Sequence, residues 1–104
     1  MAGFGDMMKA AQKMKAEMER IQAEAASKMV EGSAGGGMVT AVANGKGELL
    51  SVKIDPEVAR GDDLEMLQDL VAAAANDALR KARELMTKEV SQLAGGLGLP
   101  PGLL

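Results

Sequence analysis

The chain has 104 residues, a formal net charge of −3 and a sequence pI near 4.9, which suit one small domain and disfavour polyanion binding unless the charges are segregated. It contains no Cys and no His, which excludes disulfides, thiolate nucleophiles, imidazole bases and the usual transition-metal ligands. We therefore expect a non-enzymatic protein with no cofactor and no metal site. A core built from Met, Ala, Leu and Val is expected, since there is one Phe, no Trp and no Tyr.

The beginning of the sequence, MAGFGDMMKAAQKMKAEMER, carries charges in every helical turn. It therefore does not resemble a secretory signal, and the chain lacks the roughly 18 consecutive apolar residues that a membrane span needs. We expect a cytoplasmic protein.

A long helix is predicted over residues 6–27, which use strong helix formers and contain neither Gly nor Pro. Apolar residues recur at alternating steps of three and four: Phe4, Met7, Ala11, Met14, Met18, Ile21 and Ala25. This heptad spacing is typical of a helix that lies against another helix. The alternative is a Met-rich surface that binds other proteins.

Three antiparallel strands are predicted next, at about residues 28–33, 37–44 and 47–55. Asn44-Gly45 accepts the positive φ angles of a tight hairpin turn. The glycines between residues 31 and 55 do not match a P-loop, because Gly45-Lys46 is followed by Gly47 rather than Ser or Thr. They also lie between strands, unlike a dinucleotide fingerprint, so we interpret them as turns and sites of close backbone approach.

A second long helix is predicted from Asp63 to about Leu93, capped by Asp62 with Glu65. Residues 70–75 are apolar around the whole helix, so we expect one side to face the sheet and the other a partner subunit. Residues 1–94 form the predicted domain, and residues 95–104 are an expected disordered tail.

The remaining polar residues offer little chemistry. Asp55 with Glu57 and Asp62 with Asp63 stand at helix starts or beside Pro56, where acidic residues cap helices. The serines and threonines have no His to activate them. No catalytic residue, small-molecule substrate or membrane partner is predicted.

Charge is segregated along the chain. Residues 57–77 hold six acidic residues and one basic residue, whereas residues 80–89 hold four basic and two acidic residues. Residues 6–15 hold three lysines and one aspartate. If the two helices run antiparallel, their basic ends lie together and form one patch suited to nucleic acid.

Three stretches carry a family resemblance: MMKAAQKMKAEMERIQ, VEGSAGGGMVTAVANGKGELLSVKIDPE and LEMLQDLVAAAANDALRKARELMTKEVSQLAGGLGLPPG. Together they cover nearly the whole chain, and they resemble the YbaB/EbfC family of nucleoid-associated proteins. The combination of GSAGGG, NGKGEL and VKIDP is the most specific part of the match.

The resemblance implies an α+β fold. The expected protomer is α-β-β-β-α with a three-stranded antiparallel sheet and two long helices, and two protomers form a tweezer-like homodimer with helical arms. The implied function is binding of double-stranded DNA with little sequence specificity, in nucleoid organisation and in the regulation of gene expression.

Together with the charge pattern, the resemblance points to DNA-binding residues on both helical arms: Lys9, Lys13, Lys15, Arg80, Lys81, Arg83 and Lys88. The alternative function is a dimeric adaptor that binds proteins through its Met-rich seam and apolar tail. DNA sequence preference and the affected genes do not follow from the sequence.

Overall fold

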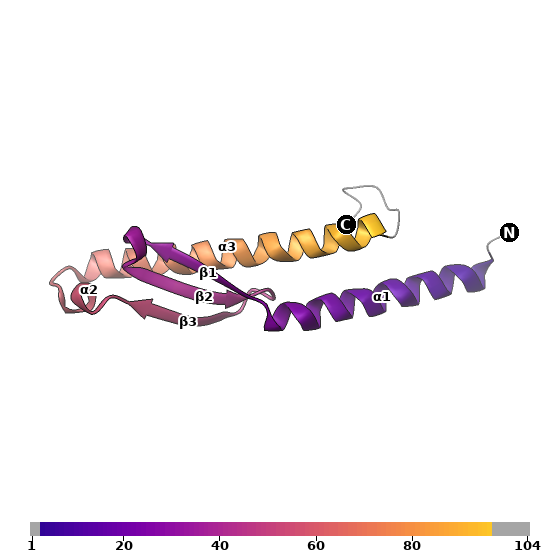
Figure 1. Cartoon of the computed structure of the whole chain (residues 1–104), viewed down its shortest axis with the longest axis horizontal. Coiled ribbons are helices and arrows are strands. Elements are labelled where there is room, and N and C mark those ends of the chain that lie inside the picture. The colour runs from indigo at the N-terminus through magenta and orange to yellow at the C-terminus, as the bar shows by residue number, and fades with distance from the viewer. Residues whose placement is uncertain (1–2, 97–104) are drawn as a thin grey trace.

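A computed structural model gives the fold and describes residues 3–96. The molecule is elongated, with extents of 71 × 22 × 17 Å. A long helix comes first, followed by three strands, a short helix and a second long helix (Figure 1). The predicted α+β class with a three-stranded antiparallel sheet and two long helices is confirmed.

The first helix, α1, spans Phe4–Ser27. Its Ala, Met, Lys, Glu and Gln residues lose little rotamer freedom in a helix, which favours the long uninterrupted element. At its end, Ser27 Oγ donates a hydrogen bond of 2.8 Å to the Glu24 carbonyl, and Lys28 turns to extended backbone. Only Ile21 and Ala25 of α1 are buried.

The sheet consists of β1 (Met29–Ala34), β2 (Val39–Asn44) and β3 (Leu49–Ile54), all antiparallel, with β2 in the centre. A one-turn 3-10 helix, η1 (Gly35–Gly37), connects β1 to β2. Val42 pairs with Ser51 and Ala43 with Leu49, so Leu50 is the extra residue of a bulge in β3.

The turn between β2 and β3 closes against the end of α1. The buried Asn44 side chain accepts hydrogen bonds of 3.1 Å from the backbone N–H groups of Lys46 and Glu48, and Gly47 adopts a φ of +86°. The Gly45 N–H donates a hydrogen bond of 2.8 Å to the Ala25 carbonyl. A Cβ on Gly45 would lie 2.9 Å from that carbonyl oxygen, which confirms the interpretation of these glycines as turn and close-approach residues.

A short helix, α2 (Pro56–Arg60), replaces the connection expected after the sheet. The Asp55 side chain accepts a hydrogen bond of 2.9 Å from the Glu57 N–H, and Pro56 occupies the first helical position. Both features are start signals for a helix, so the sequence carried the information for α2.

The last helix, α3, spans Leu64–Gly96. Its cap is Asp63 and not the predicted Asp62, because Asp63 Oδ1 accepts a hydrogen bond of 2.9 Å from the Met66 N–H. The helix also continues past Leu93, so Gly95 and Gly96 belong to it and not to the expected disordered tail. The rest of that tail, residues 97–104, lies outside the described residues.

The core lies between α3 and the inner face of the sheet, and small side chains dominate it. Three alanines four residues apart on α3 meet three residues of β2 that all point the same way: Ala74, Ala78 and Ala82 against Val39, Ala41 and Ala43. On β1, a Cβ added to Gly32 would lie 2.2 Å from the Ala78 nitrogen. The helix and the sheet therefore approach as closely as their backbones permit.

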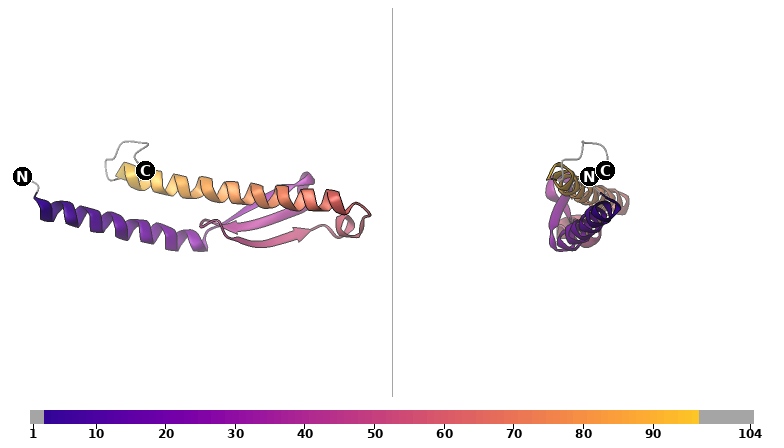
Figure 2. Two further views of the ribbon diagram at one scale, coloured as in Figure 1. Left: turned by 180° about the vertical axis from the view of Figure 1, so that it is seen from behind. Right: turned by 90° about the vertical axis from the view of Figure 1, so that its right-hand side faces the viewer.

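The two long helices run antiparallel. Both project beyond the same end of the sheet, where they form a pair of arms (Figure 2). The start of α1 and the end of α3 therefore lie at the same end of the molecule. The sheet, α2 and the beginning of α3 form the other end.

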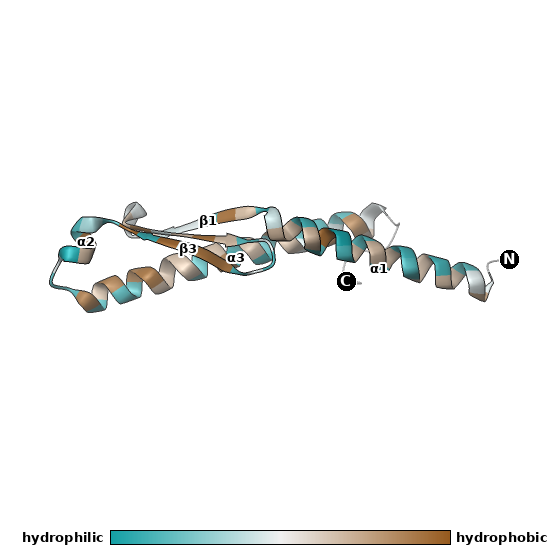
Figure 3. Ribbon diagram, turned by 90° about the horizontal axis from the view of Figure 1, so that it is seen from below, coloured by the Kyte–Doolittle hydropathy of each residue, from teal (hydrophilic) through white to brown (hydrophobic). Residues whose placement is uncertain are grey.

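The helix α3 packs mainly on β1 and β2 and leaves most of β3 uncovered. Hydrophobic residues of β3 and of the beginning of α3 are exposed, and both segments carry the brown of hydrophobic residues in Figure 3. We call the residues Leu49, Leu50, Ile54 and Leu64 the β3 face.

Candidate nucleic-acid interface

The antiparallel arrangement of α1 and α3 does not form the single patch that the charge pattern predicts, because Lys13 lies across a cleft from Leu93 and Gly96, whereas residues 80–88 of α3 lie nearer the sheet. The lysines of α1 lie in its first half, residues 80–83 of α3 lie where the helix packs on the sheet, and Lys88 lies beside Glu89 at the base of the arms. The acidic run of residues 57–77 starts at the opposite end of the molecule. The protein is therefore electrically asymmetric along its length although its net charge is −3.

On α1, the predicted residues Lys9, Lys13 and Lys15 are all exposed. None of them forms a salt bridge with another residue of the part that the structure describes. Lys13 also borders a cleft of about 350 Å³ between the arms, with Glu17, Leu93 and Gly96 among its other lining residues. The charges of the three lysines are therefore available to a ligand.

On α3, Arg83 and Lys88 are likewise exposed and take part in no salt bridge within residues 3–96. Each lies on an exposed position of the helix, next to residues that face α1 or the sheet. Together with the three lysines of α1, they give five exposed basic side chains that form no ion pair among residues 3–96: three in the first half of α1 and two on α3.

Arg80 differs from these five residues. Its guanidinium lies 2.7 Å from Asp77 Oδ1 and 2.7 Å from Glu84 Oε1. The two carboxylates raise the pKa of Arg80, and Arg80, followed by the Ser33 N–H, lowers the pKa of Asp77 to about 2. Two carboxylates therefore neutralise the charge of Arg80, although its side chain is exposed.

Lys81 fastens α3 to the edge of the sheet. Its Nζ donates a hydrogen bond of 2.9 Å to the Glu31 carbonyl and lies 3.3 Å from Asp77 Oδ2. Asp77 Oδ2 in turn accepts a hydrogen bond of 3.1 Å from the Ser33 N–H. The side chains of Lys81 and Asp77 thus form hydrogen bonds with backbone groups of β1 at the outer edge of the sheet, where no further strand pairs with it.

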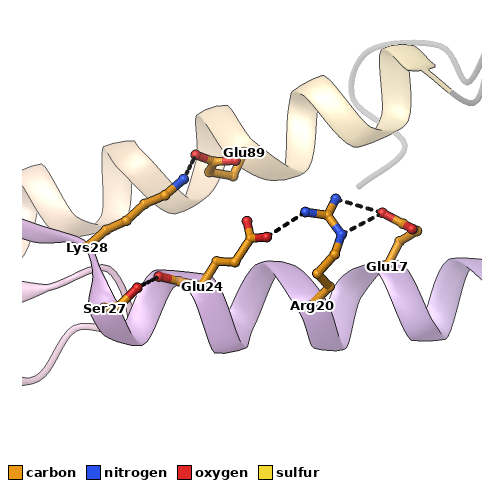
Figure 4. A network of polar contacts seen from close by, with 6 residues as sticks. All are labelled: Glu17, Arg20, Glu24, Ser27, Lys28 and Glu89. Carbon is orange, nitrogen blue, oxygen red and sulfur yellow. Dashed lines mark hydrogen bonds and ion pairs between the residues drawn. The ribbon is translucent and has the colours of Figure 1, made fainter.

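Two further basic residues, Arg20 on α1 and Lys28 just after it, form polar contacts near the base of the arms and are not among the residues predicted from the sequence (Figure 4). Arg20 bonds to Glu17 at 2.7 Å and to Glu24 at 2.9 Å, which raises its pKa. Spacings of three and four residues between opposite charges signal such pairs on a helix. Asp77 stands three residues before Arg80 and Glu84 four residues after it, so the same spacing indicates that Arg80 is paired.

Lys28 joins the two arms at their base. Its ammonium group forms a hydrogen-bonded ion pair with Glu89 of α3, which lowers the pKa of Glu89 (Figure 4). The two residues are 61 positions apart, so no local pattern in the sequence indicates the pair.

Other kinds of site are not built by the described residues. Among residues 3–96 there is no group of three or more His, Cys, Asp or Glu side chains arranged to hold a metal ion. No helix in the same range is long and apolar enough to cross a membrane.

The fold and the sequence define the class of protein. Residues 1–97 match the model of the YbaB/EbfC DNA-binding family, and the chain belongs to this family. The resemblance that the central glycine-rich motifs carry is therefore confirmed.

Curated relatives agree with this assignment. A nucleoid-associated protein of Acetivibrio thermocellus is 54% identical over 105 residues, which cover 97% of this chain and 93% of the relative. A nucleoid-associated protein of Caldanaerobacter subterraneus is 50% identical over 97 residues, covering 93% and 87%. Among solved structures, the uncharacterized Helicobacter pylori protein HP0035 shares the fold, with a TM-score of 0.70 at 24% identity, covering 93% of this chain and 98% of that one.

Proposed function

We propose that this protein is a nucleoid-associated protein that binds double-stranded DNA as a homodimer with little sequence specificity. It would act at the nucleoid, in the cytoplasm, in chromosome organisation and gene expression. The observation that carries the proposal is the set of five exposed basic side chains on α1 and α3 that form no ion pair among residues 3–96: Lys9, Lys13, Lys15, Arg83 and Lys88. Membership of the YbaB/EbfC DNA-binding family and the names of the relatives support it.

Phosphate contacts explain the low specificity. Lysine and arginine side chains on a helix surface bind phosphate oxygens, which position a protein on the duplex but carry no sequence information. The only aromatic residue of the chain is Phe4, so stacking on the bases of single-stranded nucleic acid has almost no support. Electrostatic contacts to the duplex backbone are thus the main binding energy.

The salt dependence of binding tests this proposal. Fluorescence anisotropy with two unrelated duplexes of equal length, titrated with salt, gives the number of phosphates neutralised, because each contact contributes about 0.9 to the slope of log K against log salt. We expect the triple variant Lys9→Gln, Lys13→Gln, Lys15→Gln to lose about 0.9 of slope for each contact removed. Gln keeps the helix propensity of α1.

The matched control is Arg80→Gln with Glu84→Gln, which removes one positive and one negative charge that neutralise each other. This variant should bind with nearly the wild-type slope. A salt-insensitive wild-type complex, or an equal loss of slope in the control and the triple variant, would contradict phosphate binding by the arms.

The homodimer is supported by the β3 face. β3 is an edge strand of the sheet, and its residue Leu50 is 51% exposed. An uncovered apolar edge strand pairs readily with another chain. A partner copy that covers Leu49, Leu50, Ile54 and Leu64 removes this surface from water and gives a dimer with two pairs of arms.

Light scattering coupled to gel filtration measures this association. Leu50→Lys should give a monomer, because a charge in a buried apolar interface is costly. The control is Met29→Lys on β1, an exposed position outside the β3 face, which should keep the wild-type mass. A dimer that survives Leu50→Lys but not Met29→Lys would place the interface elsewhere.

We propose no catalytic activity for this chain. The second candidate function is a dimeric adaptor that binds proteins, which the exposed Phe4 and Met7 at the arm tip favour. Protein capture from nuclease-treated lysate separates the two functions. Partners that remain in the absence of nucleic acid, together with salt-insensitive DNA binding, would favour the adaptor.

A further inference from the structure

The apolar seam of α1 changes from buried to exposed along its length. Ile21 and Ala25, near the sheet, are buried against α3 and the β2–β3 turn. Met14 and Met18 are half-buried. At the tip, Met7 is 66% exposed and Phe4, the only aromatic residue of the chain, is 79% exposed. One continuous stripe is thus covered at its base and open at its end.

The stripe is open because the two arms differ in length. The described part of α3 ends at Gly96, which lines the cleft between the arms together with Lys13 and Glu17. From Lys13 towards its start, α1 extends past the end of α3 (Figure 2). The heptad spacing continues over this overhang, and that spacing suits a second helix rather than water.

Lys9 and Lys13 lie on a different face of α1 from the seam, whereas Lys15 lies at the edge of the seam, roughly 40° from Ala11. At 3.6 residues per turn, Lys9 lies roughly 160° around the helix from both Met7 and Ala11. Lys13 lies at roughly the same angle from Ala11. A duplex bound to Lys9 and Lys13 therefore leaves the seam free, and a helix on the seam leaves these two lysines free.

We propose that the open seam, which we define as Phe4, Met7, Ala11 and Met14, docks onto the same seam of α1 from another DNA-bound copy of this protein. The two helices pair antiparallel, with Phe4 opposite the partner's Met14 and Met7 opposite the partner's Ala11. Each copy keeps Lys9 and Lys13 on its own duplex, so the contact bridges two DNA segments. This inference rests on the proposed DNA binding and goes beyond it.

The chemistry of the surface favours a second copy as the occupant. The four seam positions carry no charge, so the pairing places apolar groups against apolar groups and continues the covered contact of Ile21 and Ala25. Residues 4–14 form only about three turns, and two such segments bury less than the roughly 1,200 Å² of a stable interface. The contact is therefore weak in free solution and forms when DNA holds many copies close together.

A bridging assay tests the docking. One duplex is immobilised, a second labelled duplex is added, and the protein captures it. The variant Phe4→Gln with Met7→Gln should capture at least fivefold less labelled duplex, while its affinity for a single duplex, its salt slope and its mass in solution stay at wild-type values. The control is Met8→Gln, which changes a neighbouring exposed methionine outside the seam and should bridge like the wild type.

The outcomes separate this inference from the proposed function. A wild-type protein that binds one duplex but captures no second one overturns the bridging and leaves the DNA binding intact. Unchanged bridging by Phe4→Gln with Met7→Gln, or the same loss in Met8→Gln, also overturns it. If the wild-type protein binds no duplex, the proposed function is overturned. The cross-linking experiment below then tests by itself whether the seams of two copies dock.

Cross-linking identifies the occupant without relying on DNA. Because the chain contains no Cys, the variant Met7→Cys with Ala11→Cys presents thiols only on the seam. At high protein concentration it should form disulfides between chains, whereas Met8→Cys with Gln12→Cys should form few. If Met7→Cys with Leu99→Cys instead gives a disulfide within one chain, the segment after Gly96 occupies the seam and the inference fails.

Discussion

The sheet end and the arm end of this molecule use the same helix, α3, in opposite ways. At the sheet end, alanines of α3 lie against β1 and β2 so closely that Gly32 leaves no room for a side chain, and Asp77, Arg80 and Lys81 are engaged in ion pairs or backbone hydrogen bonds. At the arm end, α1 touches α3 with few buried residues, and its lysines and apolar tip are open. Stability is concentrated in one region and available binding surface in the other.

The largest effect should come from adding volume at the closest contact. Gly32→Val places a side chain where the Ala78 nitrogen lies 2.2 Å from a Cβ position, so α3 must move away from the sheet. We expect a loss of about 3 kcal/mol or more in the free energy of unfolding, or no folding at all. Urea unfolding followed by circular dichroism measures it.

The same kind of change in the arm should have the opposite sign. A Cβ on Gly5 meets nothing within 4 Å, and Gly5 lies inside α1. Gly5→Ala should therefore stabilise the helix by up to about 1 kcal/mol. If Gly32→Val and Gly5→Ala gave similar stabilities, the difference in packing between the two regions would be refuted.

The next effect concerns the base of the arm. Ile21 is 3% exposed, so Ile21→Ala removes buried methyl groups and leaves a cavity between α1 and α3. The expected cost is about 2–4 kcal/mol. Met7→Ala, higher on the same seam and exposed, should change the stability by less than about 0.5 kcal/mol. Comparing the thermal unfolding of the two variants shows where along α1 the packing of the seam stops contributing to stability.

The smallest effect concerns the ion pairs of the sheet end. Because Arg80 and the Ser33 N–H hold the folded-state pKa of Asp77 at about 2, below its ordinary value of 3.8, the carboxylate stabilises the fold above about pH 4. This contribution is lost as the pH falls towards 2. Asp77→Asn should therefore lower the urea midpoint at pH 7 and have little effect near pH 2. A constant difference between the two proteins across this range would show that Asp77 does not act through its charge.

Local patterns predict most of the fold, because its elements depend on neighbouring residues. Helix formers define α1, and alternation with Asn44-Gly45 defines the hairpin of β2 and β3. The helix α2 was missed although Asp55 and Pro56 are ordinary start signals, since its short length offers no periodicity. Asp63 rather than Asp62 caps α3, a difference of one residue that sequence alone does not resolve.

The candidate interface is only partly predictable from the sequence. All seven predicted basic residues lie on the two helices, but counting charges does not separate Arg80, held by Asp77 and Glu84, from residues such as Arg83 that have no such partner within residues 3–96. The spacing of opposite charges makes that separation possible within one helix. It does not reveal the pair of Lys28 with Glu89, which depends on how two distant segments come together.

The hydrogen bonds of Gly45 give the arm a mechanical connection. The Gly45 N–H reaches both the Ala25 and the Lys28 carbonyls, at 2.8 and 3.0 Å, where α1 meets the sheet. The hairpin turn is therefore hydrogen-bonded directly to the point where α1 leaves the sheet. A change in the length or conformation of the loop of residues 44–48 should consequently change the direction of the whole arm.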